Sequence, residues 1–245
     1  HVPVLAVTKG LREMADGGLE PFPHYWQRLV DSRLSINAIG GPCTSYELAD
    51  RRHSWVHFVG EDPAVLRSLK QLLETDYYHI STSTDVIGVE AAVAIKNAYA
   101  LGVAFAVGLQ EREFGIGCTP AYNPQAALFG QAAVEITRFV KLLGGRAESI
   151  SVGLGDLYVT IFGGRNRRLG TLLGRGLSME QALEELKGLT LEGTMIITRA
   201  ASALRKLESR GLASMEDYPL LQHMDEVINQ GTPVSIPWQA FTGTV

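Results

Sequence analysis

The sequence has little cysteine and no strong excess of charge of either sign. Its 245 residues contain two cysteines, Cys43 and Cys118, which are too few for a disulfide framework and lack the spacing of metal ligands. The formal net charge of −4 gives no electrostatic case for binding nucleic acid or an anionic membrane. We therefore expect no metal site and no nucleic-acid partner, with the cytoplasm as the default location.

Several catalytic and nucleotide-binding motifs are also missing from the sequence. There is no Walker loop, no HExxH and no GxSxG, and no GxGxxG opens a strand–turn–helix unit. No internal repeat or low-complexity segment is present. The first residues, VPVLAVTKG, read directly as a buried strand with no targeting segment before them, so we expect that the beginning of this domain is missing.

Two parts of the chain have different hydrophobic patterns. Residues 1–83 contain short β-branched runs separated by glycine and proline, with one helical pattern between the last two runs, which predicts an α/β domain with a parallel sheet. Residues 84–245 have helical periodicity, with Asp85 as an expected cap and a capping box at Ser178 and Gln181. We place the domain boundary at 83/84.

The run VIGVEAAVAIKNAYALGVAFAVGLQ at 86–110 contains only two charged residues, Glu90 and Lys96. Burial disfavours the charged form of a lysine, which can make it a proton donor or acceptor near neutral pH. The alternative is a lysine that extends from a partly buried helix to solvent. The run is long enough for a membrane span, but its two charges and its alanine and glycine content favour a buried core helix.

Four further segments carry candidate site residues, each with an ordinary structural alternative. Lys9 follows the first strand, where α/β proteins bind ligands, although a lysine in this position alone is more often a solvated loop residue. The turn GPCTS at 41–45 can bring backbone N–H groups to a ligand, or simply connect two elements. Asp156 in GLGDL can orient a lysine or cap a helix. The segment GGRNRR at 163–168 places three arginines at a helix start, where they oppose the helix dipole unless an anion lies among them.

Taken together, these segments resemble the NAD(P)-dependent glycerol-3-phosphate dehydrogenase family. The matching pieces occur in the family's order and run through nearly the whole chain: TKG (8–10), GPCTSYELA (41–49), STDVIGVEAAVAIKNAYA (83–100), NPQAAL (123–128), GLGDLYVT (153–160), GGRNRRLG (163–170) and LEGTMIITRA (191–200). The resemblance implies the carboxyl-terminal part of a Rossmann-type parallel-sheet domain followed by an all-helical substrate domain. It also implies an oxidoreductase that interconverts dihydroxyacetone phosphate and sn-glycerol 3-phosphate with NAD or NADP, and a homodimer without membrane insertion.

The resemblance also implies roles for individual residues. Lys96 resembles the general acid/base at the C2 oxygen, Lys9 the second active-site lysine, and Asp156 the carboxylate that supports them. The implied substrate contacts are Lys9, Gly41, Cys43, Asn97, Asp156, Thr160, Gly164, Arg165 and Asn166. The implied cofactor contacts are Lys9, Ser45, Arg165, Thr190 and Glu192.

The chain departs from the family pattern in three places. Cys43 stands where bacterial members commonly have serine, and Ser45 where they commonly have alanine. The segment GLQEREFGIGCTPAYNPQAAL is longer than its usual counterpart, and the glycine-rich pyrophosphate turn is absent. Two other hypotheses remain open: a non-catalytic helical binding or oligomerisation module, and a related dehydrogenase acting on another hydroxy acid.

Overall fold

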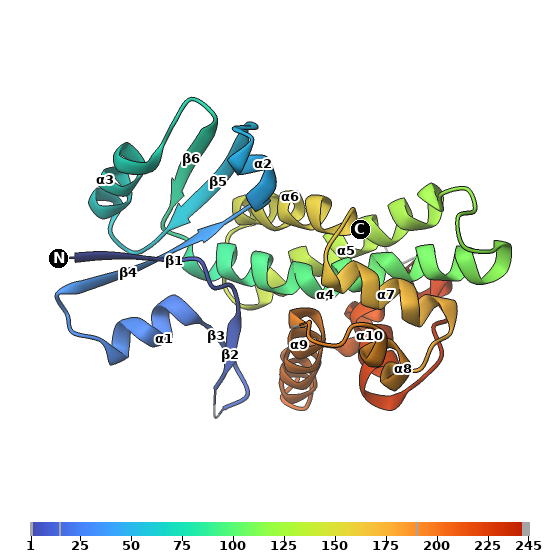
Figure 1. The fold of residues 1–245 in the computed structure, drawn as a ribbon. Helices are drawn as coiled ribbons and strands as arrows, with labels where there is room; N and C mark the ends of the chain where they lie inside the picture. The colour runs from blue at the N-terminus through green and yellow to red at the C-terminus, as the bar shows by residue number, and fades with distance from the viewer. Residues whose placement is uncertain (1, 15, 190, 242–245) are drawn as a thin grey trace. The chain divides into compact units, whose positions relative to one another are not determined.

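The computed structural model describes residues 2–14, 16–189 and 191–241. Every described strand lies before residue 84, and every described element after it is helical (Figure 1). The predicted change from α/β to helical pattern is therefore present in the structure. The prediction for Thr190 lies outside the described residues.

A four-stranded sheet has the order β1-β4-β5-β6, formed by β1 (Val2–Ala6), β4 (Leu34–Gly40), β5 (Ser54–Val59) and β6 (Tyr78–Ser83). β1 pairs with β4 in parallel, and β5 with β6 in parallel. A two-stranded hairpin of β2 (Leu11–Glu13) and β3 (Leu19–Pro21) precedes α1 (Phe22–Leu29). The hairpin and α1 carry no strong pattern in the sequence, and we did not predict them.

The expectation of a wholly parallel sheet is wrong at its centre. β4 and β5 pair antiparallel, with Ala38 opposite Val59 and Gly40 opposite His57. A parallel crossover needs a connection that runs back along the sheet, usually on a helix. The connecting helix α2 (Ser45–Ala49) has only five residues, too few to span the length of a strand, so the chain turns back beside β4 instead.

Both faces of the sheet are covered by helices. α3 (Pro63–Leu73) starts after Asp62, whose side chain accepts a hydrogen bond from the backbone N–H of Ala64. α3 buries Leu66 and Leu69 against Val56, Phe58 and Ile80 on one face. On the other face, Ala38 and Val59 pack in a cluster with Val86, Val89, Val93 and Val152 from the helical part of the chain.

The helical part contains ten described elements. The α-helices are α4 (Val86–Phe114), α5 (Tyr122–Leu142), α6 (Ile150–Ile161), α7 (Arg165–Arg175), α8 (Met179–Glu185), α9 (Glu192–Glu208) and α10 (Pro219–Gln230). Three short 3-10 helices are η1 (Ala147–Ser149), η2 (Met215–Asp217) and η3 (Trp238–Phe241). The predicted capping box of α8 is present, and Asp85 accepts a hydrogen bond from the N–H of Gly88 at the start of α4.

The long apolar helix α4 satisfies the length and composition of a membrane span, and 89% of its most apolar window is buried inside the protein. Most of its side chains in the first three turns are fully buried, including Val89, Val93 and Ile95. This burial is typical of the core helix of a globular domain. The absence of membrane insertion stays a prediction.

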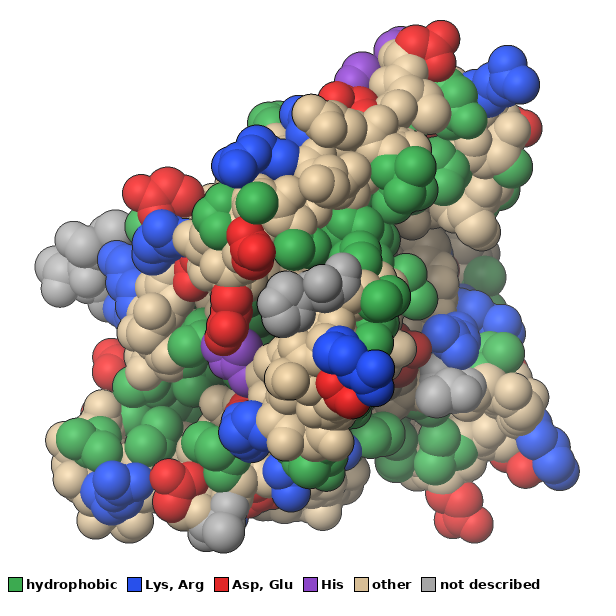
Figure 2. Space-filling view, turned by 90° about the vertical axis from the view of Figure 1, so that its left-hand side faces the viewer, with side chains coloured by type: hydrophobic (Ala, Val, Ile, Leu, Met, Phe, Trp, Pro, Cys, Tyr) green, Lys and Arg blue, Asp and Glu red, His purple; other side chains and the backbone are tan. Residues whose placement is uncertain are grey.

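Two compact units divide the chain: residues 1–96 with 136–159, and residues 97–135 with 160–245. The boundaries fall within α4, α5 and α6, so the units differ from the simple division at 83/84, which stays a prediction about domains. On the face shown in Figure 2, basic and acidic side chains are interspersed, as the mild net charge suggests.

Candidate functional site

A buried carboxylate bridges two lysines in the first compact unit. Asp156 Oδ1 lies 2.9 Å from Lys96 Nζ, and Asp156 Oδ2 lies 2.5 Å from Lys9 Nζ. Asp156 is 4% exposed and Lys96 is 6% exposed, whereas the side chain of Lys9 is 27% exposed. The structure thus brings together the three residues predicted as catalytic. Charge-assisted contacts of this kind compensate for the burial of both lysine and carboxylate.

Close packing of α4 on α6 sets this geometry. Gly153 of α6 lies against Ala92 of α4, and a Cβ at Gly153 would stand 2.6 Å from the Ala92 side chain. Lys96 follows Ala92 by four residues and Asp156 follows Gly153 by three, so each lies about one turn beyond the contact on the same helix face. The interpretation of Asp156 as a helix cap is wrong, because it lies in the interior of α6.

Glu90 is a further buried charge that we did not predict as a site residue. It is 0% exposed, and neither carboxylate oxygen has a hydrogen-bond partner among the described residues. Desolvation raises the pKa of Glu90 to about 8, although the nearby charge of Lys9 favours its ionised form. The sequence signal was its position as the only acidic residue in an apolar run of 25 residues.

The loop after β4 lies near the same lysine. β1 and β4 are parallel, so the segments that follow them, with Lys9 and Gly41–Ser45, leave the same edge of the sheet. Gly41 has a φ of +114°, which favours glycine. The side chain of Cys43 is exposed overall, and the charges of Lys9 and Asp156 act on its thiol. The main effect on the thiol is partial desolvation, which raises its pKa. Ser45 is exposed at the start of α2.

A second group of predicted residues lies together in the second compact unit. Asn166 Nδ2 donates to Asn97 Oδ1 at 3.4 Å, and Asn166 Oδ1 accepts from the N–H of Gly193 at 3.1 Å. Glu192 Oε2 lies 3.5 Å from Asn97 Nδ2, and Glu192 Oε1 lies 3.5 Å from Arg165 Nη2. Four predicted residues therefore form one polar cluster, Asn97–Arg165–Asn166–Glu192.

This cluster lies at the amino-terminal end of α7. Gly164 precedes Arg165 with a φ of +89°, and the side chain of Arg165 is 45% exposed. A helix amino terminus with an arginine beside it can bind an anion through backbone N–H groups and the guanidinium. Thr160 lies in the last turn of α6, half-buried. Lys96 and Asn97 are consecutive residues of α4, so the chain itself joins the two clusters.

Metal ligation has no candidate in the part of the chain that the structure describes. No group of three or more His, Cys, Asp or Glu side chains there is arranged to hold a metal ion.

Comparison with known proteins points to one family. A family model described as "NAD-dependent glycerol-3-phosphate dehydrogenase C-terminus" matches residues 85–238. A protein of Clostridium tetani named glycerol-3-phosphate dehydrogenase [NAD(P)+] is 32% identical over 93% of this chain and 60% of its own length. A protein of Archaeoglobus fulgidus named NADP(+)-dependent glycerol-3-phosphate dehydrogenase is 32% identical over 75% of this chain and 54% of its own length.

Solved structures give the same result. The glycerol-3-phosphate dehydrogenase of Saccharomyces cerevisiae is 25% identical, with a TM-score of 0.81 over 99% of this chain and 69% of its own. The Plasmodium falciparum glycerol-3-phosphate dehydrogenase shares the fold, with a TM-score of 0.81 over 100% of this chain and 66% of its own at 19% identity. The chain thus spans only about 54% to 60% of the length of the two sequence relatives above.

Proposed function

The chain belongs to the NAD-dependent glycerol-3-phosphate dehydrogenase family, and we propose that it carries the proton-transfer and substrate-binding residues of such an enzyme. The reaction is the interconversion of dihydroxyacetone phosphate and sn-glycerol 3-phosphate with NAD or NADP. The family resemblance first seen in the motifs of the sequence supports this proposal, and so do the names of the relatives.

The observation that carries the proposal is the carboxylate of Asp156 held between Lys9 and Lys96. Reduction of a ketone requires one proton at the oxygen as the hydride reaches the carbon. Lys96 is the proposed proton donor at the C2 oxygen, and in the reverse direction it accepts the proton. A lysine ammonium also stabilises negative charge that develops on that oxygen.

Asp156 has a positioning role in this scheme. Its two oxygens each accept from one lysine, which fixes both Nζ atoms and compensates their charge. Lys9, which is more exposed than Lys96, is the proposed contact to the substrate near the nicotinamide. Because the two lysines share one carboxylate, we expect a change in either lysine to alter the environment of the other.

The phosphate of the substrate is the proposed ligand of the second cluster. Arg165 supplies a guanidinium, Asn166 a carboxamide, and the first turn of α7 supplies backbone N–H groups. Asn97 holds Asn166 in place through its side-chain oxygen. Binding energy from a remote dianionic group of this kind can be used to position the reacting carbon.

The residues present suit the nicotinamide end of the cofactor. Lys9 and Ser45 follow parallel strands that end at the same edge of the sheet, and Gly41 turns the chain there with a φ of +114°, which favours glycine. The proposed cofactor contacts are Lys9, Ser45, Arg165, Thr190 and Glu192. When bound, the nicotinamide ring supplies or accepts the hydride. None of the motifs quoted above distinguishes NAD from NADP, and the names of the relatives include both cofactors.

Homodimerisation and a cytoplasmic location are further parts of the proposal. The dimer rests on the family resemblance, and the location on the low cysteine content of the chain. Light scattering of the purified chain tests the first, since a dimer has twice the monomer mass of 26.6 kDa.

The test is oxidation of NADH and of NADPH that depends on dihydroxyacetone phosphate. The 245-residue chain is compared with Lys96→Ala, and with Lys206→Ala as a control for loss of an exposed lysine. Turnover that Lys96→Ala abolishes and Lys206→Ala preserves supports the proposal. Turnover that survives in Lys96→Ala contradicts the role of this lysine. We expect low turnover, because the pyrophosphate-binding turn is not among the chain's residues.

A further inference from the structure

A cavity of about 230 Å³ lies within the second compact unit, lined by residues of α4, α7 and α8. Its lining includes three arginines, Arg167, Arg168 and Arg175, and one threonine, Thr171. None of these residues belongs to the proposed substrate or cofactor contacts. Two of the arginines, Arg167 and Arg168, come from the GGRNRR segment. The phosphate-binding role proposed for Arg165 does not explain why this helix start carries two further positive charges.

Two donors in the lining have no partner within the described residues. Arg167 Nε and Thr171 Oγ1 are both buried and form no hydrogen bond there, and Thr171 is only 8% exposed. Buried donors of this kind are costly to leave unsatisfied, and in a native protein they usually face a water or a ligand. Both atoms are closed to solvent, so a ligand in the cavity contacts them only when the side chains of these two lining residues turn towards it. A hydroxyl and a guanidinium are suited to a ligand with several acceptor oxygens.

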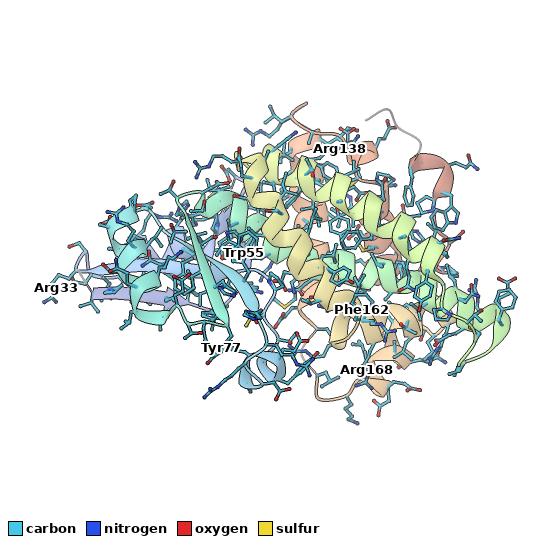
Figure 3. All side chains as sticks on the ribbon, turned by 90° about the horizontal axis from the view of Figure 1, so that it is seen from above. Arg33, Trp55, Tyr77, Arg138, Phe162 and Arg168 are labelled. Atoms are coloured by element: carbon cyan, nitrogen blue, oxygen red, sulfur yellow. The ribbon has the colours of Figure 1, made fainter. Side chains whose placement is uncertain are left out.

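The charges around the cavity leave two arginines uncompensated. Arg175 Nε lies 2.6 Å from Glu111 Oε2, so these two lining residues neutralise each other. Arg167 and Arg168 form no ion pair in the described part of the chain. Arg168 is exposed and lies at the outer edge of α7 (Figure 3). The remaining acidic residue of the lining, Glu185, is exposed on α8.

Arg167, Thr171 and Arg175 of the cavity lie on a different face of α7 from Arg165 and Asn166. Arg167, Thr171 and Arg175 are spaced by four residues, so they follow one another along one face of the helix. Asn166, one residue before Arg167, turns its side chain to Asn97 and Gly193 instead. Arg167 and Thr171 are therefore separate from Arg165 and Asn166, while Arg168, three residues after Arg165, lies between the two groups.

We propose that this cavity is a second anion site, which binds a phosphate group through Arg167, Arg168 and Thr171. Guanidinium groups donate to phosphate oxygens in pairs, and the hydroxyl supplies a further donor. The volume admits a phosphate with several attached atoms, since a water occupies only about 30 Å³ in the liquid. The ligand is either free phosphate or the phosphate of a small metabolite, which share this chemistry.

The test is a titration with inorganic phosphate, followed by NMR of the arginine Nε–H groups, with chloride added to matched ionic strength as reference. The protein is the 245-residue chain carrying Arg165→Gln, which weakens the other phosphate-binding cluster. The Nε–H signal of Arg167, identified by its loss in Arg167→Gln, is expected to shift saturably with phosphate. A parallel titration with O-phosphoserine asks whether the cavity also takes a phosphate attached to carbon.

Thr171→Val is the decisive variant, because it keeps the shape of the side chain and replaces only the hydroxyl with a methyl group. We expect it to fold, and to weaken phosphate binding at Arg167 by about tenfold, the effect of losing a hydrogen bond to a charged group. Arg168→Gln is expected to weaken binding similarly, and Arg210→Gln, an exposed arginine of the same unit, to leave it unchanged. An Arg167 signal that responds to neither titrant, or a response equal in Thr171→Val, would overturn the proposal.

Discussion

Replacing Glu90 with glutamine is expected to change how the stability of the protein depends on pH. Glu90 is fully buried on α4, with no hydrogen-bond partner for its carboxylate oxygens in the described residues. Glutamine has nearly the same shape and cannot ionise. The variant therefore isolates the free energy of ionising this one buried carboxylate.

The sign follows from the direction of the pKa shift. Burial raises the pKa of Glu90 from 4.5 in the unfolded chain to about 8 in the folded protein. The folded state therefore binds this proton more tightly, and the stability of the wild type falls as pH rises from 4.5 through 8. Each pH unit in that window is worth about 1.4 kcal/mol, so the full loss is of the order of 5 kcal/mol.

The assay is urea unfolding of the wild type and Glu90→Gln at intervals between pH 5 and 9. The stability of the variant relative to the wild type is expected to increase with pH and to level off above pH 8, by about 2 to 5 kcal/mol in total. The change with pH is the test, because a buried glutamine has its own desolvation cost that does not vary with pH. Glu113→Gln, exposed on the same helix, is the control and should show no such trend. A difference that is constant across the range would mean that Glu90 ionises normally, and would refute the reasoning.

Three further predictions concern residues of the first compact unit, and two of them have a matched control substitution. Asp156→Asn should lower the free energy of unfolding by about 3 kcal/mol in urea titrations, because it weakens the compensation of a buried lysine. The exposed control Asp31→Asn should leave the urea midpoint almost unchanged, and a loss for Asp156→Asn as small as that of the control would contradict the bridging role. Gly153→Ala should lower Tm and cost about 1 to 3 kcal/mol of stability, because the new Cβ would overlap α4. The control Gly130→Ala has open space around it and should stabilise α5 by about 0.5 to 1 kcal/mol. Equal effects of the two substitutions would refute the close contact of α4 and α6. The rate of alkylation of Cys43 by iodoacetamide should rise at a higher pH than the rate for free cysteine, because partial burial raises the pKa of the Cys43 thiol. A pH midpoint of the alkylation rate below that of free cysteine would contradict this prediction.

Helices with clear caps and periodicity could be predicted well from the sequence. The cap at Asp85 and the capping box at Ser178 both rest on local side-chain and backbone chemistry. The antiparallel pairing of β4 and β5 could not be predicted in this way. Strand direction depends on whether the connecting segment can cross the sheet, and the five-residue length of α2 is visible only in the structure.

The site shows the same division between local and long-range information. Sequence motifs singled out Lys9, Lys96 and Asp156 separately, but their contact depends on the packing of α4 against α6. Glu90 was visible as a charge in an apolar run, yet only the structure shows that it is unpartnered beside Lys9. The excess of arginine at 165–168 was noted in the sequence, whereas the cavity that separates Arg167 from Arg165 was not foreseeable.

The central claim is that the pair of lysines bridged by Asp156 belongs to a glycerol-3-phosphate site. It is tested most directly by NMR of the lysine side chains during titration with sn-glycerol 3-phosphate, with the signals of Lys9 and Lys96 identified by Lys9→Ala and Lys96→Ala. This readout does not require cofactor, and it reports on these two residues alone. The account predicts that the Lys9 and Lys96 signals shift saturably with sn-glycerol 3-phosphate and do not shift with glycerol. Lysine signals that shift with neither sn-glycerol 3-phosphate nor glycerol, or that shift equally with both, would contradict the central claim.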